Sequence, residues 1–338
     1  MQSDKLLLEV KNLKQYFPIK GGILGRTVNH VKAVDDISFT VNEGETVSLV
    51  GESGCGKSTT GRSLIRLDEP VSGEILFDGV DLLKLNKAEM RKKRKEIQFI
   101  FQDPYASLNP RMTVHQILDE AMAIQNVSEP DKRRDKIKEL LETVGLLEHQ
   151  IDLYPHQFSG GQRQRVGIAR ALSVRPRLII CDEAVSALDV SIRAQVLNLL
   201  QKLQKKFHLT YLFISHDLGV VRHISDRVIV MYLGKIMEIS DKKSLFENPQ
   251  HPYTYALLSS IPSIKVGERK ERIILTGDVP SPINPPTGCR FHTRCPFAEE
   301  ICEKEAPPLY KVTETHQSAC HMVEKGAIDL SSKEFKKK

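Results

Sequence analysis

The sequence predicts an α/β protein with a mostly parallel sheet, a helical insertion and an irregular C-terminal module. A β-branched apolar run at residues 46–50 leads into a glycine-rich loop and then into a helix. Apolar strands alternate with amphipathic helices between residues 177 and 239, which is the pattern of crossover units in parallel sheets. From about Asn248 the chain becomes rich in proline, so we expect a separate module there.

Size and composition allow a large core and favour a reducing compartment. The chain has 338 residues, enough for two domains or for one α/β domain with an extension. It has six cysteines, no apolar segment at its start, and no apolar run near the ~18 to 20 residues that span a bilayer. We therefore expect a cytoplasmic chain that does not cross a membrane alone. The basic runs at 90–97 and 333–338 are interpreted as solvated surface.

The elements are predicted in chain order from local patterns. Short strands come first, followed by a helix after the glycine-rich loop, two amphipathic helices, and then strand, helix, strand and a hairpin turning at Leu233 and Gly234. The predicted strands and helices cover residues 6–10, 33–41, 45–50, 57–67, 113–125, 131–147, 177–183, 191–207, 210–216 and 227–239. Residues 18–30 contain several glycines and are predicted to form a loop.

The first motif that carries chemistry is GESGCGKS, Gly51–Ser58, which fits G-x4-G-K-[ST]. In such a loop the backbone N–H groups and the positive end of the following helix bind the β- and γ-phosphates of a nucleotide. Lys57 adds a positive charge, and the Ser58 hydroxyl is placed to hold Mg²⁺. Together with its strand and helix flanks, the motif predicts a P-loop nucleoside triphosphatase.

A second motif ends an apolar strand in two carboxylates, Asp182 and Glu183, at the sheet edge where α/β proteins bind ligands. Asp182 would hold Mg²⁺, mainly through its water shell, and Glu183 would orient or deprotonate the attacking water. The alternative is a strand that ends in surface acids, which the glycine-rich loop elsewhere in the chain disfavours.

A third motif, FSGGQRQRVGIARAL at residues 158–172, places a Ser-Gly-Gly turn at the start of a helix. Such a turn exposes N–H groups and a helix dipole to a phosphate, so the chain has two anion-binding helix starts. We do not expect both to serve one nucleotide within one chain.

The motifs, in this order, resemble the ATP-binding subunits of ABC transporters over residues 5–245. The resemblance implies a RecA-like P-loop core with an N-terminal antiparallel β-subdomain and an inserted helical subdomain at about 103–170. It also implies that the signature turn completes the ATP site of the opposite subunit. The domains expected on this basis are an ATPase domain at 1–250 and a C-terminal module at 251–338.

The resemblance also implies roles for single residues. Gln102 in FIFQDP matches the Q-loop, Asp189 in SALD the D-loop, and His216 in ISHD the switch histidine, while Phe17, or alternatively Tyr16, aligns with the adenine-stacking aromatic residue. The catalytic residues implied are Glu183, His216 and Gln102, and those implied for Mg²⁺ are Ser58, Gln102 and Asp182. The ATP-binding residues implied are Phe17, Gly51, Ser53, Gly54, Cys55, Gly56, Lys57, Ser58, Thr59 and Asp182, with Ser159, Gly160, Gly161, Gln162 and Asp189 acting in trans.

Two stretches, FQDPYASLNPRMTV at 101–114 and NPQHPYTYALLSSIP at 248–262, closely resemble the ATPases of dipeptide and oligopeptide importers. VKAVDDISF, after a long insertion, resembles the second of the two paralogous ATPases in such systems. The resemblance implies ATP-driven peptide import at the cytoplasmic face of the membrane. The implied partners are a paralogous ATPase subunit or a second copy, two membrane permeases and an extracytoplasmic peptide-binding protein, with no nucleic acid. The alternative is a non-transport ABC ATPase whose thiol module binds nucleic acid.

Four of the six cysteines, Cys289, Cys295, Cys302 and Cys320, form a C-x5-C-x6-C-x17-C array near the C-terminal end. Four thiols can ligate one cluster or one zinc ion, and the expected compartment disfavours disulfides. The spacing is looser than in common zinc sites, and similar peptide-importer ATPases carry an iron–sulfur cluster here, so a structural [4Fe–4S] cluster is expected. The neighbouring histidines His292, His316 and His321 leave a mixed Zn²⁺ site as the first alternative, and cysteines without any ligand are the second.

Overall fold

The structure is a computed structural model that describes residues 5–21, 25–260, 275, 277–326 and 330. The chain divides into two compact units. Unit 1 consists of Met1–Leu7, Val41–Thr46 and Asp81–Ile214, and unit 2 consists of Leu8–Thr40, Val47–Val80 and Ser215–Lys338. Within the described residues, no helix is long and apolar enough to cross a membrane.

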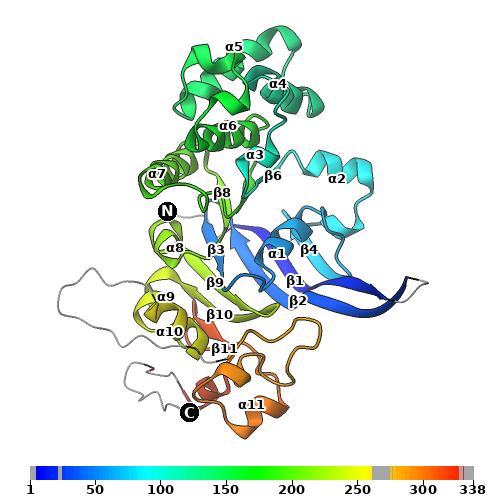
Figure 1. The fold of residues 1–338 in the computed structure, drawn as a ribbon, viewed down its shortest axis with the longest axis vertical. Helices are drawn as coiled ribbons and strands as arrows, with labels where there is room; N and C mark the ends of the chain where they lie inside the picture. Colours follow the sequence, from blue (N-terminus) through cyan, green and yellow to red (C-terminus); the bar gives the residue numbers. More distant parts are fainter. Residues whose placement is uncertain (1–4, 22–24, 261–274, 276, 327–329, 331–338) are drawn as a thin grey trace, which may run out of the picture. The chain divides into compact units, whose positions relative to one another are not determined.

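Unit 1 combines parallel strands with the helical insertion (Figure 1). Strand β7 pairs in parallel with β6 on one side and with β8 on the other. All side chains of β7 and β8 are buried, as expected for central parallel strands. The elements of this unit are η1 (Leu82–Lys84), α2 (Lys87–Lys93), β6 (Ile97–Ile100), α3 (Pro104–Ser107), α4 (Val114–Ile124), α5 (Pro130–Thr143), η2 (Glu148–Asp152), η3 (Pro155–Gln157), α6 (Gly160–Leu172), β7 (Leu178–Asp182), α7 (Val190–Phe207) and β8 (Thr210–Ser215).

Local sequence explains the start of the inserted helices. The hydroxyl of Thr113 accepts from the Gln116 N–H, and the Gln116 side chain accepts from the Thr113 N–H, so a capping box begins α4. Helix α5 begins with Pro130, whose fixed φ suits the first helical position. Helices α4, α5 and α6 contact one another through apolar faces, and the predicted helical insertion is confirmed.

Unit 2 begins with two long strands, β1 (Leu6–Gly21) and β2 (Arg26–Asn42). Strand β1 lies between β2 and β4 (Ser72–Phe77), and it pairs with β4 in antiparallel fashion with Leu8 opposite Phe77. The predicted loop at residues 18–30 is therefore wrong. Residues 18–21 extend β1 and residues 26–30 belong to β2, while residues 22–24 lie outside the described part of the chain.

A second group of strands in unit 2 contains one parallel pair, and the strands added after that pair are antiparallel. Strand β3 pairs in parallel with β9, and β9 continues into an antiparallel hairpin with β10. Leu233 (φ 47°) and Gly234 (φ 78°) form the turn, as predicted, with the left-handed backbone that two-residue hairpin turns require. The C-terminal strands add to the same edge, since β10 pairs with β12 and β12 pairs with β11. The remaining elements of unit 2 are β3 (Thr46–Val50), α1 (Lys57–Leu64), β5 (Val80–Asp81), α8 (Leu218–Ile224), β9 (Arg227–Tyr232), β10 (Lys235–Asp241), α9 (Lys242–Glu247), α10 (Pro252–Ser259), η4 (His292–Arg294), α11 (Glu300–Lys304), β11 (Tyr310–Lys311), β12 (Gln317–Ser318) and η5 (His321–Lys325).

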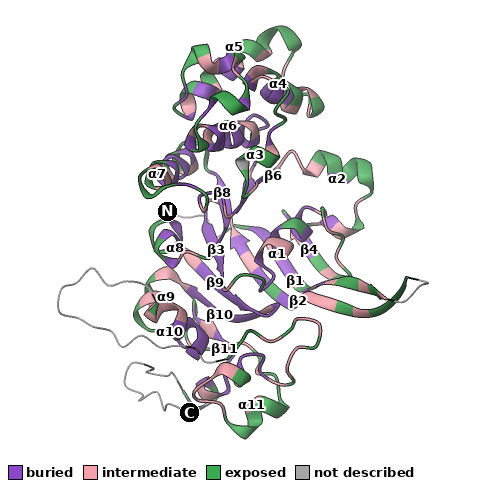
Figure 2. Ribbon diagram, in the orientation of Figure 1, coloured by how far each residue is buried: buried purple, intermediate pink, exposed green. Residues whose placement is uncertain are grey.

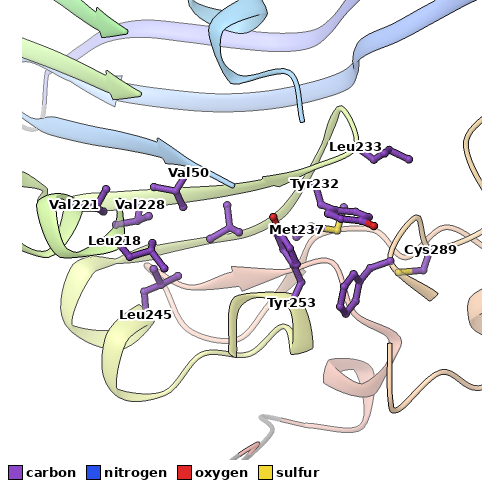
Figure 3. Packing of buried hydrophobic residues seen from close by; sticks show 12 residues of the cluster. Val50, Leu218, Val221, Val228, Tyr232, Leu233, Met237, Leu245, Tyr253 and Cys289 are labelled. Carbon is purple, nitrogen blue, oxygen red and sulfur yellow. The ribbon is translucent and has the colours of Figure 1, made fainter. Parts of the chain in front are cut away.

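The C-terminal segments of unit 2 share a core with its strands. Strands β9 and β10 are buried along most of their length (Figure 2). Tyr232 of β9 packs against Tyr253 of α10 and against Phe291, with ring centroids 4.8 and 5.4 Å away. Figure 3 shows Tyr232, Met237, Tyr253 and Cys289 gathered in this cluster. Tyr253 and Phe291, from the C-terminal part of the chain, therefore pack on β9, the strand next to β3 in the sheet.

Candidate functional site

The glycine-rich loop Gly51–Ser58 follows β3 and leads into α1, and its glycines fit where no other residue would. Gly51, Gly54 and Gly56 have φ of 151°, 78° and 104°. A Cβ on Gly51 would lie 2.1 Å from the Met231 carbonyl oxygen, and one on Gly56 would lie 2.1 Å from the Ala33 carbonyl oxygen. The loop therefore depends on glycine for both backbone conformation and space.

The start of α1 is arranged for an anion. Gly56 is the N-cap of the helix and, as glycine, has no side chain that could cap the first-turn N–H groups. Lys57 is buried, and its Nζ donates to the carbonyl oxygens of Gly51 and Glu52, each at 2.9 Å. The ammonium group is thus held inside the curve of the loop. Cys55 is also buried, and burial raises the pKa of its thiol despite the nearby Lys57.

In unit 1 the parallel pairing of β6 and β7 brings two predicted catalytic residues together. Ile100 lies opposite Cys181, so Gln102 and Glu183 both follow the carboxyl ends of neighbouring strands. The Gln102 Nε2 donates to the Glu183 Oε2 at 2.9 Å. Asp182 is buried at the end of β7, and Glu183 has φ 46°, which turns the chain directly after it. His216 is an exposed residue of unit 2 that directly follows β8.

The signature turn and the predicted D-loop lie next to each other in unit 1. The Ser159 hydroxyl accepts from the Gln162 N–H at 3.3 Å, and the Gln162 side chain accepts from the Ser159 N–H, which caps α6. Asp189 caps α7 by accepting from the Ile192 N–H at 3.0 Å. A Cβ on Gly161 would lie 2.3 Å from Ile192 Cγ2, so the two helices are in close contact there. Ser159, Gly160 and Asp189 are exposed.

The two candidate aromatic residues on β1 differ in their surroundings. The Tyr16 hydroxyl donates to the Asp35 carboxylate, and burial together with that carboxylate raises the Tyr16 pKa above its ordinary range. Phe17 is 36% exposed. The Tyr16 hydroxyl is thus hydrogen-bonded to Asp35, whereas the ring of Phe17 is partly exposed to solvent.

The prediction of an iron–sulfur cluster, with zinc as its alternative, is wrong. Within the part of the chain that the structure describes, no three Cys, His, Asp or Glu side chains are arranged to hold a metal ion. The relatives reported below are named for ATP binding and peptide transport alone. The four cysteines instead line one cavity of about 20 Å³, room for about one water molecule.

Competing partners of the candidate histidines agree with this correction. Burial raises the pKa of Cys289 to about 11 and of Cys295 and Cys320 to about 12, so these thiols are protonated in the metal-free chain. The candidate histidines have other contacts. His292 lies against the Cys289 carbonyl oxygen, His321 against that of Glu305, and His316 pairs with the buried Glu238 carboxylate at 2.6 Å.

Glu52, inside the glycine-rich loop, makes contacts that the sequence did not indicate. Its backbone N–H donates to the Tyr253 hydroxyl at 2.8 Å, and its carboxylate accepts from Arg294 Nη1 at 2.8 Å. The partners lie 201 and 242 residues further along the chain. A local sequence pattern cannot predict a contact between residues that lie so far apart in the sequence.

In unit 2, a strand is followed by the glycine-rich loop and a helix. In unit 1, a strand ends in two carboxylates, and a Ser-Gly-Gly turn caps the start of a helix. These features define an ABC-type ATP-binding subunit. Residues 34–186 match the family described as ABC transporter. Residues 237–302 match the family described as oligopeptide/dipeptide transporter, C-terminal region.

Curated relatives extend the similarity over nearly the whole chain. The oligopeptide transport ATP-binding protein AppF of Bacillus subtilis is 56% identical over 323 residues, which are 95% of this chain and 98% of AppF. A Brucella ovis protein named for peptide import and ATP binding is 52% identical over 314 residues, covering 93% of this chain and 97% of the relative. The chain belongs to the family of peptide-transporter ATP-binding proteins, and it is an ABC-type ATPase.

Solved structures agree with the fold. The ATP-binding cassette MJ0796, determined as a dimer bound to ADP and Pi, aligns with a TM-score of 0.62 at 30% identity, over 70% of this chain and 99% of that one. The cbiO1 subunit from Clostridium perfringens aligns with a TM-score of 0.60 at 28% identity, over 72% and 91%. The predicted P-loop core, antiparallel β-subdomain and helical insertion are confirmed.

Proposed function

We propose that this chain hydrolyses ATP to drive the uptake of dipeptides or oligopeptides through partner permeases. The observation that carries the proposal is the presence, on one chain, of an ABC ATPase region and a peptide-transporter C-terminal region. The names of the relatives, which refer to oligopeptide transport and peptide import, support it. The alternative nucleic-acid-binding function relied on a metal-stapled thiol module, and no group that could hold a metal ion is found among the described residues.

The proposed nucleotide site uses Gly51–Ser58 with Thr59 for the phosphates. The positive end of α1, which starts after Gly56, and the buried Lys57 ammonium supply positive potential to the β- and γ-phosphates. Ser53, Gly54, Cys55 and Gly56 contribute through their backbone. We assign the adenine to the exposed ring of Phe17 rather than to Tyr16, whose hydroxyl is bound to Asp35.

Ser58, Gln102 and Asp182 would hold Mg²⁺. Hydroxyl, amide and carboxylate oxygens are the donors that this ion prefers, so the residue types fit it. When bound, Mg²⁺ neutralises charge on the phosphates. The Gln102 amide uses its nitrogen to hold Glu183, and its carbonyl oxygen would be the atom of this side chain that serves as a Mg²⁺ ligand.

Glu183 is proposed to orient or deprotonate the attacking water. The hydrogen bond from Gln102 orients the Glu183 carboxylate, which is the type of group that can accept a proton from water. His216, exposed after β8, is proposed to contact the γ-phosphate. Ser159, Gly160, Gly161, Gln162 and Asp189 are proposed to act on the nucleotide of the opposite subunit, for which the exposure of the α6 start is suitable.

The proposed assembly follows from these roles. The chain would pair with a paralogous ATPase, or with a second copy, beneath two membrane permeases at the cytoplasmic face, and an extracytoplasmic peptide-binding protein would deliver the substrate. Residues 1–250 would form the ATPase domain and residues 251–338 the accessory module. No nucleic acid is involved.

Affinity purification of this chain after co-expression with the neighbouring genes tests the assembly. We expect two hydrophobic membrane proteins and a second ATPase to co-purify in detergent. A chain that stays in the soluble fraction and carries nucleic acid would contradict the proposal.

A further inference from the structure

Glu52 is the point where the phosphate loop meets the C-terminal part of the chain. Its carbonyl oxygen accepts from Lys57 Nζ at 2.9 Å, inside the loop. Its N–H donates to the Tyr253 hydroxyl, and its carboxylate accepts from Arg294, both at 2.8 Å. All three partners belong to unit 2. The backbone and the side chain of one loop residue are therefore fixed from three directions.

The two outer partners are themselves held firmly. Tyr253 is fully buried, and its ring packs against Tyr232 and Phe291 at centroid distances of 4.8 and 5.3 Å. It stands near the start of α10, where its N–H donates to the His251 side chain at 3.1 Å. The hydroxyl that receives the Glu52 N–H is thus placed by the aromatic core shown in Figure 3.

Arg294 differs from an ordinary surface cation. Its side chain is 8% exposed and that of Glu52 is 25% exposed. Burial lowers the Arg294 pKa, but the hydrogen bonds and charges of Glu52 and Tyr232 outweigh burial, so the pKa is raised overall. Exposed ion pairs contribute little to stability, whereas a shielded charge that loses its partner is costly. The geometry therefore couples the position of Glu52 to that of Arg294.

A second connection reaches the same loop from the same C-terminal segment. Arg290 donates to the Leu233 carbonyl oxygen and to the Asp35 carboxylate. Gly234, which follows Leu233 in the β9–β10 turn, donates its N–H to the Cys55 carbonyl oxygen at 2.9 Å. The β9–β10 turn thus lies between Arg290 and the middle of the phosphate loop.

We propose that the C-terminal module holds the phosphate loop in its nucleotide-binding conformation, with Arg294 and Tyr253 acting through Glu52 as positioning residues. The inference rests on the proposed role of Gly51–Ser58 in binding the triphosphate. A loop whose N–H groups already converge loses less conformational entropy when phosphate binds. Releasing Glu52 should weaken nucleotide binding without removing any group that touches the nucleotide.

The test measures binding of MgATP and MgADP to the full chain, together with KM and kcat for ATP hydrolysis. Arg294→Met keeps the apolar stem and removes the charge. We expect its Kd for both nucleotides to rise about tenfold, with kcat at saturating ATP within about twofold of wild type. Tyr253→Phe removes only the hydroxyl and should raise both Kd values about threefold. Lys311→Met breaks the exposed Lys311–Glu314 pair of the same module and serves as the matched control, with unchanged affinity expected.

A double-mutant cycle separates positioning from general stability. If Arg294 acts through Glu52, Arg294→Met should have less than about a twofold further effect on Kd in a Glu52→Gln background. Arg294→Lys should recover part of the affinity. Additive effects, or wild-type affinity in Arg294→Met and Tyr253→Phe, would overturn the inference even if both variants unfold at lower temperature.

The Lys57→Ala variant distinguishes failure of the positioning role of Arg294 and Tyr253 from failure of the proposed function. Loss of binding in Lys57→Ala, with normal binding in Arg294→Met, would reject the positioning role alone. Normal binding in Lys57→Ala would reject the proposed phosphate site itself.

Discussion

At the scale of single residues, the contact between Gln102 and Glu183 is the most informative one for catalysis. The two residues follow the carboxyl ends of the neighbouring strands β6 and β7, and the hydrogen bond from Gln102 orients the Glu183 carboxylate. Glu183 follows a buried strand and has a left-handed backbone, which turns the chain directly after β7. A small change in this side chain should therefore act on chemistry rather than on folding.

We predict that Glu183→Gln leaves MgATP affinity within about twofold of wild type and lowers kcat at least about 100-fold. The amide keeps the shape of the side chain but cannot accept the proton of the attacking water. Nucleotide titration and steady-state phosphate release measure the two effects. Glu139→Gln, at an exposed position of α5, is the control. Near-normal turnover with unaltered binding would remove Glu183 from its role.

His251 gives a prediction about pH. It is fully buried, its side chain accepts from the Tyr253 N–H, and burial lowers its pKa to about 3. The buried Glu238 accepts from the His251 N–H and pairs with His316. His251 also lines the small cavity together with His292, His321 and the four C-terminal cysteines, so all of these are ionisable groups near it. Because the unfolded histidine has its ordinary pKa of about 6.5, the unfolded state binds more protons below that pH.

The stability contributed by neutral His251 is thus fully present above about pH 6.5 and is lost as the pH falls toward 3. His251→Asn keeps a cap for α10 and removes the titration. Between about pH 8 and about pH 5, the wild type should lose about 2 kcal/mol more unfolding free energy than the variant. Urea unfolding at the two pH values measures this difference, and equal losses in both proteins would contradict the burial of a neutral imidazole.

At the scale of elements, the start of α6 is the feature best suited to contact another subunit. Ser159 and Gly160 are exposed, the helix is 13 residues long, and Gly161 allows α7 to pack tightly beside it. The element therefore presents a capped, positively polarised helix end to solvent.

We predict that Ser159→Arg leaves the MgATP affinity of the isolated chain within about twofold of wild type. The assembled ATPase pair should lose at least about tenfold in turnover, because a long cation crowds the turn that faces the partner's phosphate. Ala88→Arg places the same side chain at an exposed position of α2 and serves as the control. Loss of nucleotide affinity by orders of magnitude in the isolated chain would contradict action in trans.

Local patterns predicted most of these elements, because strand runs, caps and the Leu233–Gly234 turn are encoded by neighbouring residues. The hairpin of β1 and β2 was missed for a physical reason. Gly21 has little strand preference, but a Cβ there would lie 3.0 Å from Val28 Cγ1, so the position is set by close approach of the partner strand. Cross-strand packing is not visible in either segment alone.

At the scale of the whole molecule, the sequence predicted the family and the order of its motifs but not the contacts between distant segments. Cysteine spacing suggested a cluster, whereas no three Cys, His, Asp or Glu side chains of the described chain are arranged to hold a metal ion, and His316 pairs with Glu238 instead. The contacts of Glu52 with Tyr253 and Arg294 likewise depend on the packed fold of unit 2. Such contacts have no local signature, because they join segments more than 200 residues apart.

The central claim, that ATP hydrolysis by this chain drives peptide uptake, is tested most directly by transport into proteoliposomes. The chain would be reconstituted with the permeases, the second ATPase and the peptide-binding protein, with labelled di- and tripeptides on the binding-protein side and MgATP on the other. We predict that labelled peptide accumulates only with MgATP, and that Glu183→Gln in this chain abolishes accumulation while the complex stays assembled. Accumulation that is equal without MgATP, or absent from a fully assembled complex that hydrolyses ATP, would contradict the claim.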